Sequence, residues 1–186
     1  MSWQYIQADQ VSPQRWRNGG GWTRELLAWP SGTDWALRIS VADIEADGPF
    51  SAFPDIDRWF AVLQGEGVRL FDRDWRLSDG LLAFDGALAP DCRLLGGMTR
   101  DFNLMHRRDQ GHMAVESRQT SADRCMNIEA SGDWFGLFLP EGGELTMANQ
   151  TVNLAPLTLA WTQERSSAHL HACGWVWHMQ WTKDKR

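Results

Sequence analysis

The chain has 186 residues, of which 43% are hydrophobic and 23% are charged, and its formal net charge is −6 at pH 7. This length supports a full hydrophobic core, and this composition excludes a wholly disordered protein. An acidic chain without a basic run or a long apolar segment is predicted to bind neither nucleic acid nor a membrane.

Short strand-like runs separated by turns follow one another along the chain. Residues 23–29 and 34–42 flank the turn sequence PSGTD, and residues 58–72 predict two strands around a Gly-Glu-Gly turn. The same pattern continues through residues 75–86, 92–97, 112–118, 134–148, 150–162 and 168–181. No long run has the helical period of about 3.6 residues, so the sequence predicts an all-β fold with little helix, as a sandwich or barrel.

A weak internal repeat divides this series of strands into two halves. At a spacing of 77 residues the same kind of residue recurs without a gap, in the pairs Gly65 and Gly142, Leu77 and Leu154, Leu82 and Leu159, and Phe84 and Trp161. The repeat predicts two similar β-barrel halves, residues 1–108 and 109–186, with the seam near residues 107–112.

The stretch RWRNGGGWTRE, residues 15–25, has three interpretations. A phosphate-binding glycine loop would be followed by a helix and a Lys-Ser or Lys-Thr pair, whereas residues 23–27 have the pattern of a strand. A tight turn explains the glycines, which tolerate positive φ angles. It does not explain the polar residues around them, and bare backbone N–H groups beside arginine and glutamate side chains can hold a small polar ligand.

Several blocks resemble the HutD/Ves family of small bicupin proteins. They are WRNGGGWTRE, LRISVADIEADGPFSAFPDIDR, LQGEG, AFDG and DFNLMHRR, and they span most of residues 15–108. The resemblance implies two cupin-like β-barrels of the RmlC-like kind in one chain, and, through the family name, a link to histidine utilisation. Asp55 departs from the glycine expected after Phe-Pro.

Many cupins hold a metal through His-x-His, a following glutamate and a closing glycine. If Gly65 is the closing glycine, Arg58 stands at the glutamate position and residues 51–54 contain no histidine. A guanidinium repels a metal ion and attracts an anion, so we expect no metal and no other cofactor in the first half. In the second half, His169 and His171 share one strand face without a carboxylate at the required distance, and whether they bind a metal stays open.

A ligand site is therefore expected in the first half. Its side chains would come from the glycine stretch, from the strand-like run around Arg38 and from two positions with polar groups between apolar neighbours. The predicted ligand-binding residues are Asn18, Gly20, Gly21, Thr23, Arg24, Glu25, Arg38, Ser40, Arg58, Asp101 and Asn103. Each arginine has a competing interpretation, in which it pairs with a nearby carboxylate and only ties strands together.

The predicted function is that of a small-molecule binding protein for a carboxylate metabolite, with a regulatory or scavenging role. The alternative is a metal-independent cupin isomerase or hydrolase, with acid–base chemistry by Glu25 or Asp101 left open and no catalytic residue assigned. A third is an interaction module that uses exposed tryptophans. The three cysteines form no CxxC pair, and the first ten residues have no signal-peptide pattern, so we expect a cytoplasmic protein. Pairing of sheet edges would give a homodimer.

Overall fold

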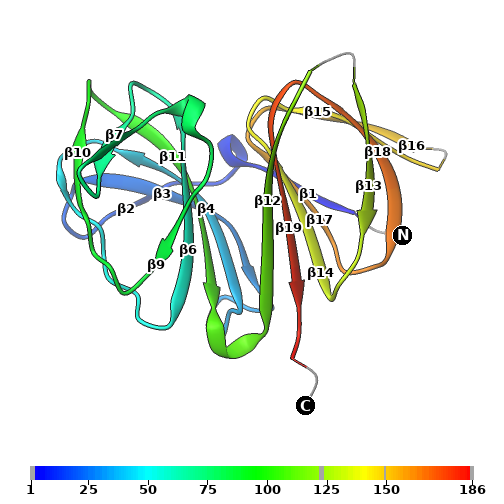
Figure 1. Cartoon of the computed structure of the whole chain (residues 1–186), viewed down its shortest axis with the longest axis horizontal. Helices are drawn as coiled ribbons and strands as arrows, with labels where there is room; N and C mark the ends of the chain where they lie inside the picture. Colours follow the sequence, from blue (N-terminus) through cyan, green and yellow to red (C-terminus); the bar gives the residue numbers. More distant parts are fainter. Residues whose placement is uncertain (1–2, 122–123, 149, 185–186) are drawn as a thin grey trace. The chain divides into compact units, whose positions relative to one another are not determined.

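The computed structural model describes residues 3–121, 124–148 and 150–184. In these residues the secondary structure is almost entirely β: nineteen strands, β1–β19, and three short 3-10 helices, η1–η3 (Figure 1). The prediction of an all-β fold with little helix is confirmed. The chain forms two compact units, a first unit of residues 11–109 and a second unit of residues 1–10 and 110–186.

The first unit contains two open sheets. The larger has the strand order β2-β3-β4-β11-β6-β9, and the smaller has the order β5-β10-β7-β8. Their bounds are β2 Gln14–Arg15, β3 Gly21–Trp29, β4 Leu37–Ile44, β5 Gly48–Pro49, β6 Ile56–Gln64, β7 Val68–Leu70, β8 Arg73–Trp75, η2 Leu77–Asp79, β9 Leu82–Asp85, β10 Asp91–Leu94, β11 Thr99–Arg107 and η3 Arg108–Gln110.

The second unit also contains two open sheets. They have the strand orders β1-β17-β14-β19-β12 and β13-β18-β15-β16. Their bounds are β1 Gln4–Gln7, η1 Ala8–Gln10, β12 His112–Thr120, β13 Cys125–Ala130, β14 Trp134–Leu139, β15 Gly143–Met147, β16 Gln150–Leu154, β17 Thr158–Thr162, β18 Ser166–Ala172 and β19 Gly174–Thr182.

The two units repeat one strand arrangement. The order β4-β11-β6-β9 in the first unit corresponds to β12-β19-β14-β17 in the second, and β5-β10-β7-β8 corresponds to β13-β18-β15-β16. Most corresponding strands lie close to 77 residues apart, as β7 at residues 68–70 and β15 at residues 143–147 do. The spacing that the sequence shows at a few glycines and apolar residues therefore runs through the whole strand order.

The N-terminal segment lies with the second unit. Strand β1 pairs with β17 along Gln4–Gln7, and the N–H of Ala8 donates to the carbonyl of Leu157. These residues were predicted to lie in the first half, because the repeat with a spacing of 77 residues begins only after them. Nothing local in MSWQYIQADQ indicates that its partner strand lies about 150 residues further along the chain.

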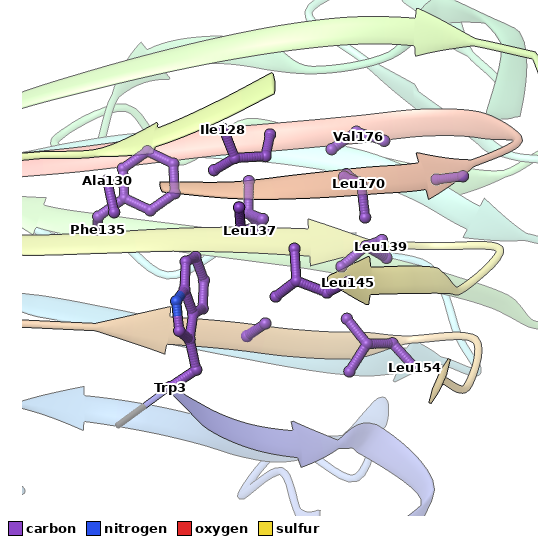
Figure 2. Close-up of a cluster of buried hydrophobic side chains, with 13 residues drawn as sticks. Trp3, Ile128, Ala130, Phe135, Leu137, Leu139, Leu145, Leu154, Leu170 and Val176 are labelled. Carbon is purple, nitrogen blue, oxygen red and sulfur yellow. The ribbon is translucent and has the colours of Figure 1, made fainter. Parts of the chain in front are cut away.

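Each unit has its own apolar core. In the first unit Phe60, Val62, Val68 and Leu70 pack together with the buried thiol of Cys92. In the second unit strands from both sheets contribute Ile128, Phe135, Leu137, Leu139, Leu145, Leu154, Leu170 and Val176, and Trp3, just before β1, packs with them (Figure 2). Apolar and polar residues alternate along strands such as β18, which is why the inward residues form one continuous layer.

Short strands and 3-10 turns leave little room for long helices. Within the described ranges, no helix is long and apolar enough to cross a membrane. The cysteines Cys92, Cys125 and Cys173 are unpaired.

Candidate functional site

A cavity of about 440 Å³ opens beside the larger sheet of the first unit. Its walls come from the β2–β3 hairpin, the inner faces of β4, β6 and β11, and the segment around β5. The lining residues are Gln14, Arg15, Trp16, Arg17, Asn18, Thr23, Arg38, Ser40, Ala42, Pro49, Phe50, Ser51, Phe53, Arg58, Asn103 and Met105. Four of them are arginines, and no lining residue is acidic.

The strand register explains why these distant residues meet. In the antiparallel pairs of this sheet, Asn103 of β11 lies opposite Ser40 of β4 and opposite Phe60 of β6. Met105 lies opposite Arg38 and Arg58 in the same way. Directly opposed residues share one face of a sheet, so β4, β6 and β11 aim alternate side chains at the same space.

The glycine stretch forms the turn of the β2–β3 hairpin. The N–H of Gly19 donates to the carbonyl of Trp16, and the N–H of Gly20 donates to the side-chain oxygen of Asn18 at 3.0 Å. Gly19 has a φ of +74°, which favours glycine. Because two of the glycine amides already donate within the turn, the glycines shape the wall of the cavity, and we assign Gly20 and Gly21 no ligand contact.

Gly21 allows the Trp16 ring to lie against the hairpin. A Cβ atom at this position would lie 2.3 Å from the carbonyl oxygen of Asp43 and 3.1 Å from carbons of the Trp16 ring. The indole N–H of Trp16 donates to the Thr23 hydroxyl at 2.7 Å, which fixes the ring as an aromatic wall. The absence of a side chain at Gly21 therefore allows β3 to lie close to β4 and allows the Trp16 ring to form part of the cavity wall.

We expect Gly21→Ala to lower the free energy of unfolding by about 1–3 kcal/mol, because the added methyl group forces β3 and β4 apart. Chemical denaturation measures this loss. Gly20→Ala is the matched control: its Cβ would meet only the Asn18 side chain, at 3.4 Å, so its effect should stay within about 0.5 kcal/mol. Equal stability of the two variants would contradict the close approach at Gly21.

Arg58 lies on the floor of the cavity with only 5% of its surface exposed. Its guanidinium carbon lies 5.1 Å from the ring centres of Phe50 and Phe84 and 5.6 Å from that of Phe53. It donates to the Asn103 side-chain oxygen at 2.7 Å and to the Ser51 carbonyl at 3.3 Å, while its Nε–H is buried without a partner. Burial lowers the pKa of Arg58 to about 10, which still leaves it charged at neutral pH.

Asp101 lies behind Asn103 and is itself fully buried. The Asn103 amide donates to one Asp101 carboxyl oxygen, and the other oxygen has no partner. Desolvation raises the Asp101 pKa well above its usual range, despite the opposing attraction of Arg58. Because Asn103 stands between the two groups, Asp101 gains no direct ion pair, and the neutral acid is the form that burial favours. Arg58 therefore has no carboxylate in direct contact with its guanidinium.

The remaining arginines lie nearer the mouth of the cavity. Arg38 donates to Glu25 at 2.5 Å, and Arg15 pairs with Glu45 while its guanidinium lies 4.8 Å from the Trp22 ring centre. Glu25 thus acts on the site through Arg38. Arg17 lines the cavity as an exposed residue, and no acidic partner for it occurs among the described residues.

Arg24 points away from the cavity. It forms an ion pair with Asp43 at 2.6 Å, and Arg100 binds the same carboxylate at 2.6 Å. These two arginines lower the pKa of Asp43, although burial alone would raise it. The alternation along β3 explains this placement, because Thr23 faces the cavity and its neighbour must face the other way. Arg24 is therefore not part of the site that we propose.

The second unit has a smaller cavity, of about 220 Å³, between the corresponding strands β12, β13, β14 and β19. Its lining includes Glu116, Arg118, Glu129 and His178. Arg118 already donates to Glu116 at 2.6 Å, and burial lowers the His178 pKa to about 4, so the imidazole is neutral at pH 7. This cavity lacks the surplus of positive charge that the first one has.

Neither unit presents an obvious metal centre. In residues 3–121, 124–148 and 150–184 there is no group of three or more His, Cys, Asp or Glu side chains placed to hold a metal ion. His169 and His171 lie at outward positions of β18, and His169 Nδ1 lies 3.0 Å from the Asn127 side-chain oxygen. In the first unit, Arg58 stands at the position where many cupins have the glutamate that binds the metal.

The sequence analysis missed the aromatic and basic walls. Trp16, Phe50 and Phe53 line the cavity, as do Arg15 and Arg17. Four of the five lie inside the blocks that carry the family resemblance, and Arg15 directly precedes the first block, so this position was the available signal. Aromatic side chains in a strand-rich chain usually belong to the core, so the residue type of these three did not indicate a ligand site.

A comparison with protein families decides where the chain belongs. The family model described as HutD matches residues 8–177, which is most of the chain. The chain belongs to the HutD family. Of the curated relatives, an "Uncharacterized 21.2 kDa protein in hutC 3'region" of Pseudomonas putida is 42% identical over 110 residues, or 55% of this chain and 57% of the relative.

Another relative is "Protein Ves" of Citrobacter koseri, 32% identical over 113 residues, which are 58% of this chain and 59% of that protein. The chain thus spans less than two thirds of the length of these curated relatives. The HutD family match and these relatives agree with the resemblance that the N-terminal blocks indicate.

Solved structures share the fold over nearly the whole chain. A conserved protein of unknown function from Pseudomonas aeruginosa PAO1 has a TM-score of 0.84 at 23% identity, covering 99% of this chain and 100% of that one. HutD from Pseudomonas fluorescens SBW25 has a TM-score of 0.80 at 21% identity over 99% and 100%. A cupin 2 conserved barrel domain protein from Leptotrichia buccalis, with a TM-score of 0.58 at 9% identity over 96% of each chain, supports a cupin-like fold.

Proposed function

We propose that this HutD family protein is a cytoplasmic binding protein for a small carboxylate metabolite, with a regulatory role linked to histidine utilisation. The observation that carries the proposal is Arg58, a buried cation on the floor of a cavity that has no acidic lining residue. A buried charge is costly unless it is paired, so a cavity built around one favours a ligand that brings the opposite charge.

The donors around Arg58 fit a carboxylate in particular. Its Nε–H has no partner, and the Thr23 and Ser40 side chains and the Asn18 amide also line the space. A planar guanidinium matches the geometry of a carboxylate, and the Phe50 and Phe53 rings lie beside it.

Binding is favoured over catalysis by the position of the acidic groups. Asp101, which would be the natural proton donor, lies behind Asn103 and is not among the lining residues. Glu25 is held by Arg38. A general acid or base has to reach the bound ligand within hydrogen-bond distance, and neither carboxyl group is placed to do so.

The link to histidine utilisation rests on names. The chain belongs to the HutD family, and the Pseudomonas putida relative is described by its place in the hutC 3' region. The metabolites to test first are therefore urocanate, formiminoglutamate and formylglutamate.

We propose further that the two units are the two cupin barrels of a bicupin chain. The repeated strand order and the likeness to a cupin barrel domain protein support this reading. The ligand site belongs to the first barrel, since its cavity carries the surplus of positive charge.

A thermal-shift screen of small carboxylates tests the proposed function. We expect at least one carboxylate to raise the unfolding temperature in a saturable way, while its amide, which lacks the charge, does not. Any hit is then incubated with the protein and followed for turnover by NMR. Stabilisation by amides as well as by acids, or conversion of the hit, would contradict the proposal of a carboxylate-binding protein without catalysis.

A further inference from the structure

The cavity of the first unit holds more positive charge than one carboxylate would balance. Four guanidinium groups line it. Arg15 and Arg38 each have a carboxylate partner, Glu45 and Glu25, on the protein itself. The other two, Arg17 and Arg58, have none in the described part of the chain, and these two determine the charge that a ligand meets.

Arg17 and Arg58 lie at different depths. Arg58 is buried on the floor, held by Asn103 and the Ser51 carbonyl. Arg17 belongs to the exposed turn of the β2–β3 hairpin, at the mouth. Trp16 and Phe50 line the same cavity and give it aromatic walls. A ligand that satisfies both cations needs an anionic group at each end.

We infer that the ligand of this site is a dianion of the dicarboxylate type, with one carboxylate on Arg58 at the floor and the second on Arg17 at the mouth. The inference rests on the proposed function, because it assumes that the cavity binds a carboxylate. A single phosphate group is the poorer match, since its charged oxygens surround one phosphorus atom, whereas one arginine is buried on the floor and the other is exposed. The aromatic residues that line the cavity suit the methylene or unsaturated chain that joins two carboxylates.

The test uses unbranched dicarboxylates from malonate to adipate and the monomethyl ester of each, measured by isothermal titration calorimetry. The ester keeps the length and one carboxylate and loses the second charge. At the best-binding length we expect the diacid to bind about fivefold tighter than its ester at low ionic strength, the size expected for one exposed ion pair. Added salt should reduce this ratio, because Arg17 is exposed.

Arg17→Gln should remove the preference, so that diacid and ester bind alike at the level of the ester. The control is Arg93→Gln, an exposed arginine of β10 in the same unit that does not line the cavity, which should leave the ratio unchanged. Equal binding of diacid and ester by the unmodified protein, or an unchanged preference in Arg17→Gln, would overturn the inference and leave the proposed function standing. If none of these acids and esters binds the unmodified protein, the inference fails, and the thermal-shift screen of other carboxylates decides the proposed function separately.

Discussion

Arg58→Met should weaken the binding of a carboxylate ligand by about 30-fold or more, which corresponds to about 2 kcal/mol for a charge-assisted pair. Methionine is the chosen replacement because Arg58 does more than face the cavity. Its side chain lies among the Phe50, Phe53 and Phe84 rings, and alanine would leave a void there. A flexible apolar side chain fills this space and removes only the charge and the donors.

Isothermal titration calorimetry measures this loss, and Arg93→Met, with its exposed side chain, is the control. Arg58→Lys gives a second comparison, since it keeps a positive charge and loses the planar donor geometry. We expect it to bind more weakly than the unmodified protein and more tightly than Arg58→Met. Undiminished binding in Arg58→Met would show that the ligand does not meet this residue.

Asp101→Asn should stabilise the fold, and the gain should grow as the pH rises. The pKa of Asp101 is raised in the folded state above its unfolded value, so the folded state binds a proton that the unfolded chain has already lost. The stability that depends on this proton is complete below the unfolded pKa and is lost as the pH rises through the folded one. Asparagine keeps the neutral shape and has no proton to lose.

The difference in unfolding free energy between Asp101→Asn and the unmodified protein, measured by denaturation from pH 4 to pH 8.5, isolates Asp101. His178 titrates in the opposite sense: its folded pKa of about 4 lies below the usual value of 6.5, so its contribution falls as the pH drops between the two. Burial raises the Cys92 pKa to about 12, which affects stability only above the measured range. The contributions of His178 and Cys92 are present in the variant and in the unmodified protein, so they cancel in the difference between the two unfolding free energies. A variant that is less stable at pH 8 than at pH 4, relative to the unmodified protein, would mean that Asp101 is ionised.

The sequence predicted the fold class because strand patterns are local. Alternation of apolar and polar residues is visible in stretches such as SSAHLHA, and it corresponds to the alternating burial of β18. The 77-residue spacing of Gly65 and Gly142 also has a local cause, because both glycines have positive φ angles in corresponding turns, between β6 and β7 and between β14 and β15. The pairing partner of β1 could not be predicted from the sequence, because β1 pairs with β17, which lies about 150 residues later in the chain.

The site was only partly predictable for the same reason. Arg38, Ser40, Arg58 and Asn103 stood out as polar residues in apolar strands, and the structure places all four around one cavity. Whether an arginine at these positions meets a ligand or an acidic side chain of the protein depends on the register in which the strands pair. Arg38 pairs with Glu25 next to a β-bulge between Glu25 and Leu27, and no feature of the sequence predicts this bulge.

The raised pKa of Asp101 was likewise hidden from the sequence. It depends on complete burial and on the amide of Asn103, two residues later on the same strand, taking the position nearer Arg58. Sequence alone places an aspartate near two arginines and favours an ion pair. The structure shows instead a cation, an amide and an acid in series, which leaves the cation available to a ligand.

The central claim is that Arg58 receives the carboxylate of the ligand, and a crystal structure of the complex with the tightest-binding carboxylate tests it most directly. We predict a carboxylate oxygen about 3 Å from a guanidinium nitrogen of Arg58, with the rest of the ligand between Trp16 and Phe50. A ligand bound outside the first-unit cavity, or bound inside it with its carboxylate turned away from Arg58, would contradict the account.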